Sequence, residues 1–156
     1  MKRVFLLFIF SMLIVAPVAG QEACSDYMDE LVTRLEGISR RLRAYTNSES
    51  SIRSDYTWWM ENRLALQEID PPECGVDVHA EAIRLYANLG DMSFWALWLQ
   101  VDPDSNSGRR QALEAITRTE QSIIDVVDVV NEVGGITYYT SAFSDRLEAI
   151  GEELDN

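Results

Sequence analysis

Apolar residues recur at intervals of three and four in five segments of the chain, and no segment of comparable length alternates with a period of two. Intervals of three and four place side chains on one side of a helix, whereas alternation would place them on one face of a strand. The clearest segment predicts a helix over about 25–46, with Ser25 or Asp26 as its N-cap. Its apolar face consists of Met28, Leu31, Leu35, Ile38, Leu42 and Tyr45.

A second predicted helix follows a polar break in which Thr46 and Glu49 have the spacing of a capping box. It has to end before Pro71 and Pro72, because proline offers no N–H and disfavours helical geometry in the residue before it. One face of this helix carries Ile52, Tyr56, Trp59 and Leu66.

A third predicted helix, over about 76–100, carries two neighbouring apolar stripes. One stripe consists of Val78, Ala82, Leu85, Leu89, Met92, Ala96 and Leu99, and the other of Ile83, Tyr86, Phe94 and Leu97. A face of this width indicates contact with more than one neighbour. We therefore expect this helix at the centre of the fold.

Two more helices are predicted over about 108–133 and from about 136 to the acidic end of the chain. The polar segment 102–108 separates the first of them from the central helix, with Ser105 or Ser107 as a candidate N-cap, and Gly134 and Gly135 supply the next turn. Their apolar faces are Ala112, Ile116, Ile123, Val127 and Val130, then Ile136, Tyr139, Phe143, Leu147, Ile150 and Leu154. The whole pattern predicts an all-α, antiparallel up-down bundle of four helices plus a C-terminal fifth helix.

The first twenty residues have the form of a secretory signal peptide. Lys2 and Arg3 precede an apolar run, and small residues follow up to Gly20. A membrane anchor would need about 20 apolar residues, and this run is shorter. We expect cleavage after residue 20, a single domain over 21–156, and a location outside the cytoplasm, either secreted or periplasmic.

Charge excludes several functions. Removal of residues 1–20 leaves 11 arginines against 26 carboxylates, a net charge of −15, and no lysine. Such a field repels phosphate backbones and anionic lipid surfaces, so we expect no nucleic-acid partner and no membrane binding. The absence of lysine excludes Schiff-base chemistry, and a single histidine permits at most one imidazole base. No cofactor is predicted.

Cys24 and Cys74 are the only cysteines. In an exported chain two cysteines favour one disulfide over free thiols. In an up-down-up bundle the first and third helices begin at the same end, and each cysteine lies close to one of those two starts. We therefore predict a structural disulfide between Cys24 and Cys74.

The region around His79 resembles a metal or catalytic cluster at first sight, with Asp77 and Glu81 close by. Residues two apart on a helix point to different sides, so these three do not converge as ligands. We interpret His79 as a histidine in the first turns of a helix, and we predict no metal site. Asp102, Asp104 and Asn106 have the first spacings of a calcium loop, but Ser107 and Leu113 stand where such a loop needs glycine and glutamate.

The four tryptophans are the most informative candidates for function. They come in two pairs, Trp58 with Trp59 and Trp95 with Trp98. If Trp59 points into the core, Trp58 lies at its boundary, since adjacent helical residues diverge by about 100°. Trp98 falls outside both stripes of the central helix. Trp58 and Trp98 are therefore the candidate binding residues.

Two hypotheses remain open on this basis. The first is an exported, non-enzymatic helical domain that binds a protein or a small apolar ligand through an aromatic surface patch near Trp58 and Trp98. The second is a small secreted α-helical hydrolase or lyase that uses carboxylates and His79. The arginines at 34, 40, 41 and 43 flank the first helix, where such charges are usually solvated or weakly paired.

Overall fold

The computed structural model describes residues 19–134 and 140–155. Its elements are α1 (Ala19–Ala44), α2 (Glu49–Gln67), the 3₁₀ turn η1 (Glu73–Gly75), α3 (Val76–Val101), α4 (Asn106–Gly134) and α5 (Ser141–Asp155). The predicted signal peptide lies almost wholly outside the described residues. Among the helices that are described, none is long and apolar enough to span a membrane.

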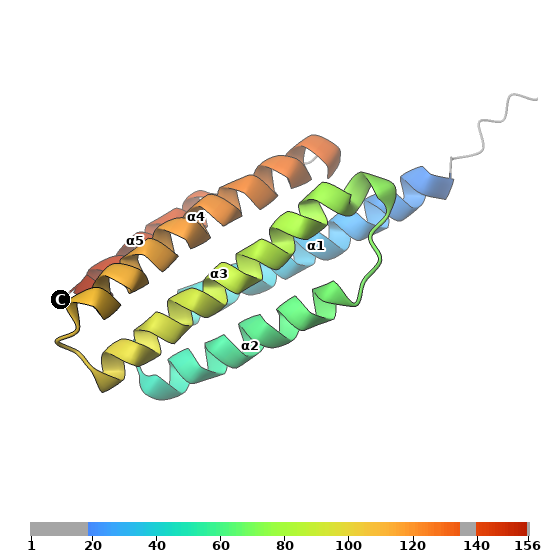
Figure 1. The fold of residues 1–156 in the computed structure, drawn as a ribbon. Helices are drawn as coiled ribbons and strands as arrows, with labels where there is room; N and C mark the ends of the chain where they lie inside the picture. Colours follow the sequence, from blue (N-terminus) through green and yellow to red (C-terminus); the bar gives the residue numbers. More distant parts are fainter. Residues whose placement is uncertain (1–18, 135–139, 156) are drawn as a thin grey trace, which may run out of the picture.

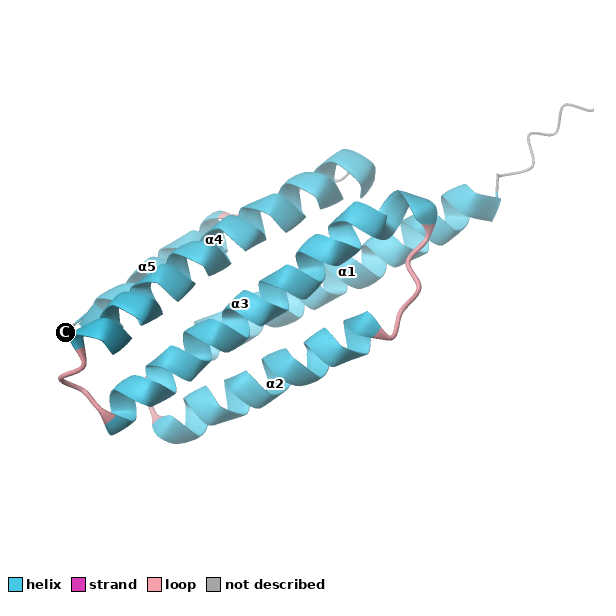
Figure 2. Cartoon of the chain, in the orientation of Figure 1, coloured by secondary structure: helices cyan, strands magenta, loops and turns pink. Residues whose placement is uncertain are grey.

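The helices run lengthwise and antiparallel to their chain neighbours (Figures 1 and 2). The closest backbone packing is between α3 and α4 and between α2 and α3, and α5 lies against α4 and α1. This arrangement confirms the predicted bundle of four helices with a fifth packed on it. It also confirms the central position of α3, whose wide apolar face contacts two neighbours.

The core contains most of the predicted apolar faces, but Tyr56 is half-buried and Phe94 is exposed. The predicted apolar residues Ile136 and Tyr139 lie outside the described residues. The five predicted apolar residues that lie in α1 are buried, as are Tyr45 just after it and the predicted apolar residues of α4. On α2, Ile52, Trp59 and Leu66 are completely buried, two helical turns apart from one another. The indole N–H of Trp59 donates to Ser93 Oγ of α3 at 3.1 Å, so the largest core side chain also has its polar atom paired.

Two predicted caps are wrong and one is confirmed. Ser25 and Asp26 lie inside α1 and cannot be its N-cap, because the helix already begins at Ala19. At the start of α2 the cap is Ser48, whose Oγ accepts from the Ser51 N–H at 3.4 Å, rather than Thr46. Ser105 caps α4 as predicted, since its Oγ accepts from the Gly108 N–H at 3.2 Å.

Both ends of α1 are tied to other elements. The disulfide between Cys24 and Cys74 joins its first turns to η1, with 6.3 Å between the two Cα atoms, and confirms the predicted pairing. At the other end, the Arg146 guanidinium of α5 donates to the carbonyl oxygens of Leu42 at 2.9 Å and Tyr45 at 2.7 Å. The Leu42 carbonyl also accepts from the Tyr45 N–H at 3.3 Å, so Arg146 supplements the backbone hydrogen bonds at the end of α1.

Candidate functional site

An aromatic surface covers the C-terminal half of α3. Phe94, Trp98 and Val101 project from successive turns and are exposed to 46 %, 44 % and 81 %, with Trp95 half-buried beside them. The rings contact one another edge to face, with 5.2 Å between the ring centroids of Phe94 and Trp95 and 6.5 Å between those of Trp95 and Trp98. We call these four residues the α3 aromatic face.

The Trp98 side chain is held in place by the start of α4. A Cβ atom added to Gly108 would lie 2.8 Å from Cδ1 of Trp98, closer than two carbon atoms can approach. Because Gly108 has no side chain, the indole can rest directly on the α4 backbone. The exposed indole is therefore oriented before any partner binds.

Trp58 belongs to α2 and lies between α2 and α1. Its ring rests against Gly37 of α1, where an added Cβ would lie 3.5 Å from the indole, and it meets Trp59 edge to face at 4.9 Å between centroids. The guanidinium of Arg41 stacks over the indole, 4.8 Å from its centroid. Trp58 is thus half-buried, as its place beside Trp59 suggests.

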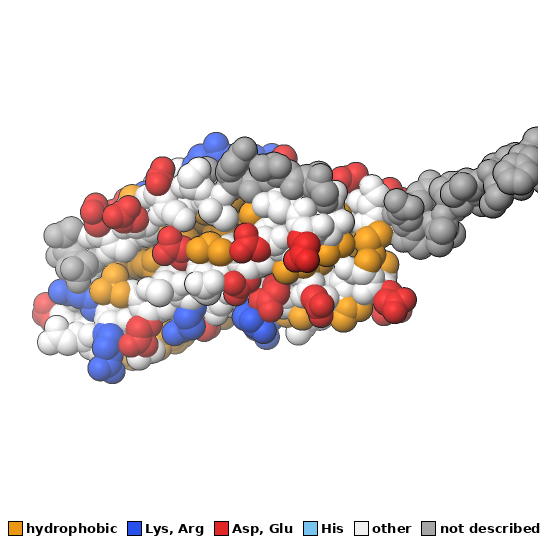
Figure 3. Space-filling model, turned by 90° about the horizontal axis from the view of Figure 1, so that it is seen from above, with side chains coloured by type: hydrophobic (Ala, Val, Ile, Leu, Met, Phe, Trp, Pro, Cys, Tyr) orange, Lys and Arg blue, Asp and Glu red, His pale blue; other side chains and the backbone are white. Residues whose placement is uncertain are grey.

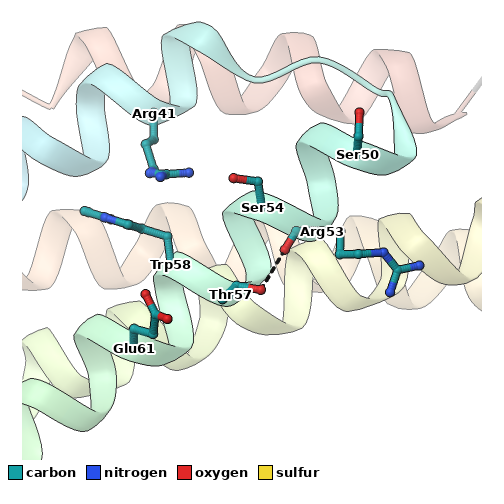
Figure 4. Close-up of a pocket in the computed structure, with 7 residues that line it drawn as sticks. All are labelled: Arg41, Ser50, Arg53, Ser54, Thr57, Trp58 and Glu61. Atoms are coloured by element: carbon teal, nitrogen blue, oxygen red, sulfur yellow. Dashed lines mark hydrogen bonds between the residues drawn. The ribbon is translucent and has the colours of Figure 1, made fainter.

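A groove of about 460 Å³ opens beside Trp58 (Figure 4). Arg41 enters it from α1 and points toward Trp58 and Ser54, while Arg53 points away from them. We call this the α1–α2 groove, and its lining consists of Arg41, Ser50, Arg53, Ser54, Thr57, Trp58 and Glu61.

A partly buried ion pair fixes one wall of the groove. Arg41 Nη1 donates to Asp55 Oδ1 at 2.5 Å, and the Asp55 side chain is only 8 % exposed. Burial raises the pKa of the Asp55 carboxyl, and the hydrogen bond from Arg41 offsets part of that rise. Since Asp55 holds one end of the guanidinium and Trp58 one face, Arg41 has little freedom to move.

The structure does not bring Trp58 and Trp98 together. Trp58 contacts α1 through Gly37, whereas Trp98 contacts the start of α4 through Gly108. The two predicted binding residues therefore belong to separate surfaces. Phe94 was assigned from the sequence to a buried stripe and is exposed instead, because α2 packs on the side of α3 that carries Ser93. Its spacing of four from Trp98 and seven from Val101 is the signal that would have identified it.

His79 lies in the core against Tyr27 of α1. It is 8 % exposed, and its Nδ1 shares a hydrogen bond with the buried Tyr27 hydroxyl at 2.5 Å. Burial lowers the pKa of His79, and the positive charge of Arg34 lowers it further. The pKa of Tyr27 is raised to about 12, mainly by burial and also by Glu30. The pair is a neutral structural contact between α1 and α3.

On the face formed by α4 and α5, acidic side chains occur along the whole length of the bundle (Figure 3). Figure 3, which looks onto the bundle from the side of α4 and α5, shows acidic side chains scattered along its length with hydrophobic side chains in strips between them. No group of three or more histidine, cysteine or acidic side chains within 19–134 and 140–155 is placed to hold a metal ion.

Comparison with known proteins finds no relative. No protein-family model matches the chain, and neither a curated protein nor a solved structure is significantly similar to it.

Proposed function

We propose that this chain is an exported, non-enzymatic helical domain that binds a basic partner protein through the α3 aromatic face. The observation that carries the proposal is the exposure of Phe94, Trp98 and Val101 on successive turns of one helix. Exposed aromatic side chains that adjoin one another mark interaction surfaces more often than scattered apolar residues do. Tryptophan is also among the residues that contribute most to protein–protein binding.

Several features favour a protein over a small apolar ligand. The α3 aromatic face lies on the outer side of its helix, where a partner surface can lie against it. An apolar cavity inside the bundle, lined in part by Leu31, Leu85 and Val126, has a volume of only about 10 Å³. Sites for small molecules have volumes of roughly 300–1,000 Å³. The apolar surface of this chain therefore suits a macromolecule.

Charge and preorganisation narrow the class of partner. With a net charge of −15 after signal cleavage, two copies of this chain repel each other, whereas a basic protein is attracted from a distance. Because Gly108 already orients the Trp98 indole, binding loses less side-chain entropy than it would with a free indole.

Export is supported by the signal sequence together with the disulfide, since disulfides persist in oxidising compartments. The alternative of a hydrolase or lyase has less support. His79 is engaged by Tyr27 inside the core, and neither Asp77 nor Glu81 makes a hydrogen bond to it. We therefore favour binding as the function.

Position-specific photo-crosslinking in the living source organism tests the proposal. A photoreactive amino acid replaces Trp98 in one variant and Val76 in another. Val76 is a matched control, because it lies at the opposite end of the same helix and is 51 % exposed. We expect an adduct with a basic protein from position 98 and none above background from position 76.

The captured protein is then purified and its affinity measured for the wild type, Trp98→Ala and Val76→Ala. Loss of a central interface tryptophan should weaken binding at least about 30-fold, which corresponds to about 2 kcal/mol. Added salt should weaken binding further. Equal adducts at both positions, an adduct with a second copy of the chain, or unchanged affinity of Trp98→Ala would overturn the proposal.

A further inference from the structure

The α1–α2 groove is a second candidate site, separate from the α3 aromatic face. It lies in the seam that Trp58 fills, and its volume of about 460 Å³ falls in the range of small-molecule sites. Unlike the α3 aromatic face, it is hollowed and lined mostly by polar side chains. It therefore suits a small polar ligand instead of an apolar protein surface.

Three polar side chains in the groove have no protein partner. Ser50, Ser54 and Glu61 make no hydrogen bond or ion pair with any part of the chain that the structure describes. The Thr57 hydroxyl donates to the Arg53 carbonyl of its own helix at 3.0 Å and keeps its acceptor lone pairs. These groups lie along one face of α2 and offer both donors and acceptors to a ligand.

The charges in the groove disfavour an anionic ligand. Arg41 is paired with Asp55, and Arg53 is paired with Glu49 at 2.6 Å. Glu61 adds a further negative charge, so each cation is already neutralised and the groove as a whole is slightly negative. A phosphate, sulfate or carboxylate would gain little from arginines that are already paired. The groove therefore favours an uncharged ligand with several hydroxyl groups.

Trp58 supplies an aromatic surface in fixed orientation, since the Arg41 guanidinium stacks on one side of its ring and leaves the side toward Glu61 to a ligand (Figure 4). A sugar ring presents C–H groups on its faces and hydroxyl groups around its rim, so it needs an aromatic surface next to mixed donors and acceptors. We propose that the α1–α2 groove binds an uncharged saccharide. Its C–H groups pack against Trp58, and its hydroxyl groups bond to Ser50, Ser54 and Glu61. Because an open groove covers less of a ligand than a closed pocket does, we expect weak binding, with a dissociation constant on the order of millimolar.

Proton–nitrogen NMR of the disulfide-bonded protein tests this proposal, because each of the four indole N–H groups gives its own signal. The probes are maltotriose, cellotriose and chitotriose at millimolar concentrations, with inorganic phosphate as the anionic comparison. We expect at least one trisaccharide to shift the Trp58 signal saturably, while the Trp95 and Trp98 signals stay unchanged. The Trp58 signal is assigned by its loss in Trp58→Phe.

Surface variants keep the test independent of folding. Ser54→Ala should weaken saccharide binding about 3- to 10-fold, the effect of one lost hydrogen bond. Thr57→Val should weaken it similarly, and Thr117→Val is the matched control, because the Thr117 hydroxyl also bonds to its own helix backbone but lies on α4. The proposal is overturned if no trisaccharide moves the Trp58 signal, if all indole signals move together, or if phosphate alone moves it. None of these outcomes bears on the α3 aromatic face.

Discussion

Two regions of this bundle depart from the usual distribution of polar and apolar residues, in opposite directions. Where α1 meets α2 and α3, buried polar side chains are paired, Asp55 with the half-buried Arg41 and Tyr27 with His79. On the outer side of α3, aromatic rings such as Trp98 face solvent. The members of these two pairs satisfy each other within the fold, whereas the outer side of the exposed rings is open to solvent. In these two regions, the presence or absence of a partner within the chain separates structural groups from candidates for binding.

The largest effect on stability should come from removing the disulfide between Cys24 and Cys74. The Cys24→Ala, Cys74→Ala double variant opens a loop of 50 residues, which costs about 4 kcal/mol in the chain-entropy description. Urea unfolding of the variant and of the reduced wild type should give the same lowered midpoint. A urea midpoint equal to that of the oxidised wild type would show that the disulfide adds no stability.

The second-largest effect should come from the ion pair between Arg41 and the buried Asp55. Arg41→Met leaves the Asp55 carboxylate buried without its partner and should lower the free energy of unfolding by about 3 kcal/mol. Adding Asp55→Leu should restore most of this loss, because the unpaired charge is removed. Arg40→Met is the control, since Arg40 is exposed and bonds only to its own helix backbone. If Arg41→Met and Arg40→Met lowered the free energy of unfolding equally, the pairing of Arg41 with Asp55 would add no more stability than an exposed arginine does.

The burial of His79 should make stability depend on pH. Burial lowers the pKa of His79 in the fold, while in the unfolded chain it titrates near about 6.5. Below about pH 6.5, His79 is therefore protonated in the unfolded chain but still neutral in the folded protein. The free energy of unfolding should fall as the pH is lowered, until folded His79 is itself protonated. Each unit by which the pKa is lowered costs about 1.4 kcal/mol.

His79→Gln isolates this contribution, because glutamine can still form a hydrogen bond to Tyr27 but does not titrate. The difference in unfolding free energy between wild type and variant should be constant above pH 6.5 and change below it. A difference that stays constant from pH 8 to pH 5 would mean that His79 is not held neutral by the fold.

The smallest effect on stability should come from the exposed aromatic face. Gly108→Ala gains helix propensity of up to about 1 kcal/mol but forces the Trp98 indole away from α4, so its net effect should be small. Acrylamide should quench Trp98 fluorescence more strongly in this variant. Gly151→Ala is the control, because a Cβ there meets only ordinary contacts, the nearest at 3.8 Å. Unchanged quenching in Gly108→Ala would show that α4 does not orient the indole.

Much of the candidate site could be predicted from local spacing alone. Trp98 falls outside both apolar stripes of its helix, and its exposure follows from that position. The neighbouring Phe94 was misplaced, because a stripe shows that a face is apolar but not which neighbour covers it. The α1–α2 groove could not be predicted, since Arg41 and Ser54 lie on different helices and meet only when α1 and α2 pack.

The sequence by itself determined the helices, their order and the disulfide. The helices follow from the spacing of apolar residues and from the proline and glycine residues between them. The disulfide follows from two cysteines that lie near helix starts at the same end of an up-down bundle. The tertiary structure alone decided the pairing of Tyr27 with His79 and the separation of Trp58 from Trp98. The physical reason is that the period of a helix fixes which side chains share a face. Only packing decides which of those faces another helix covers.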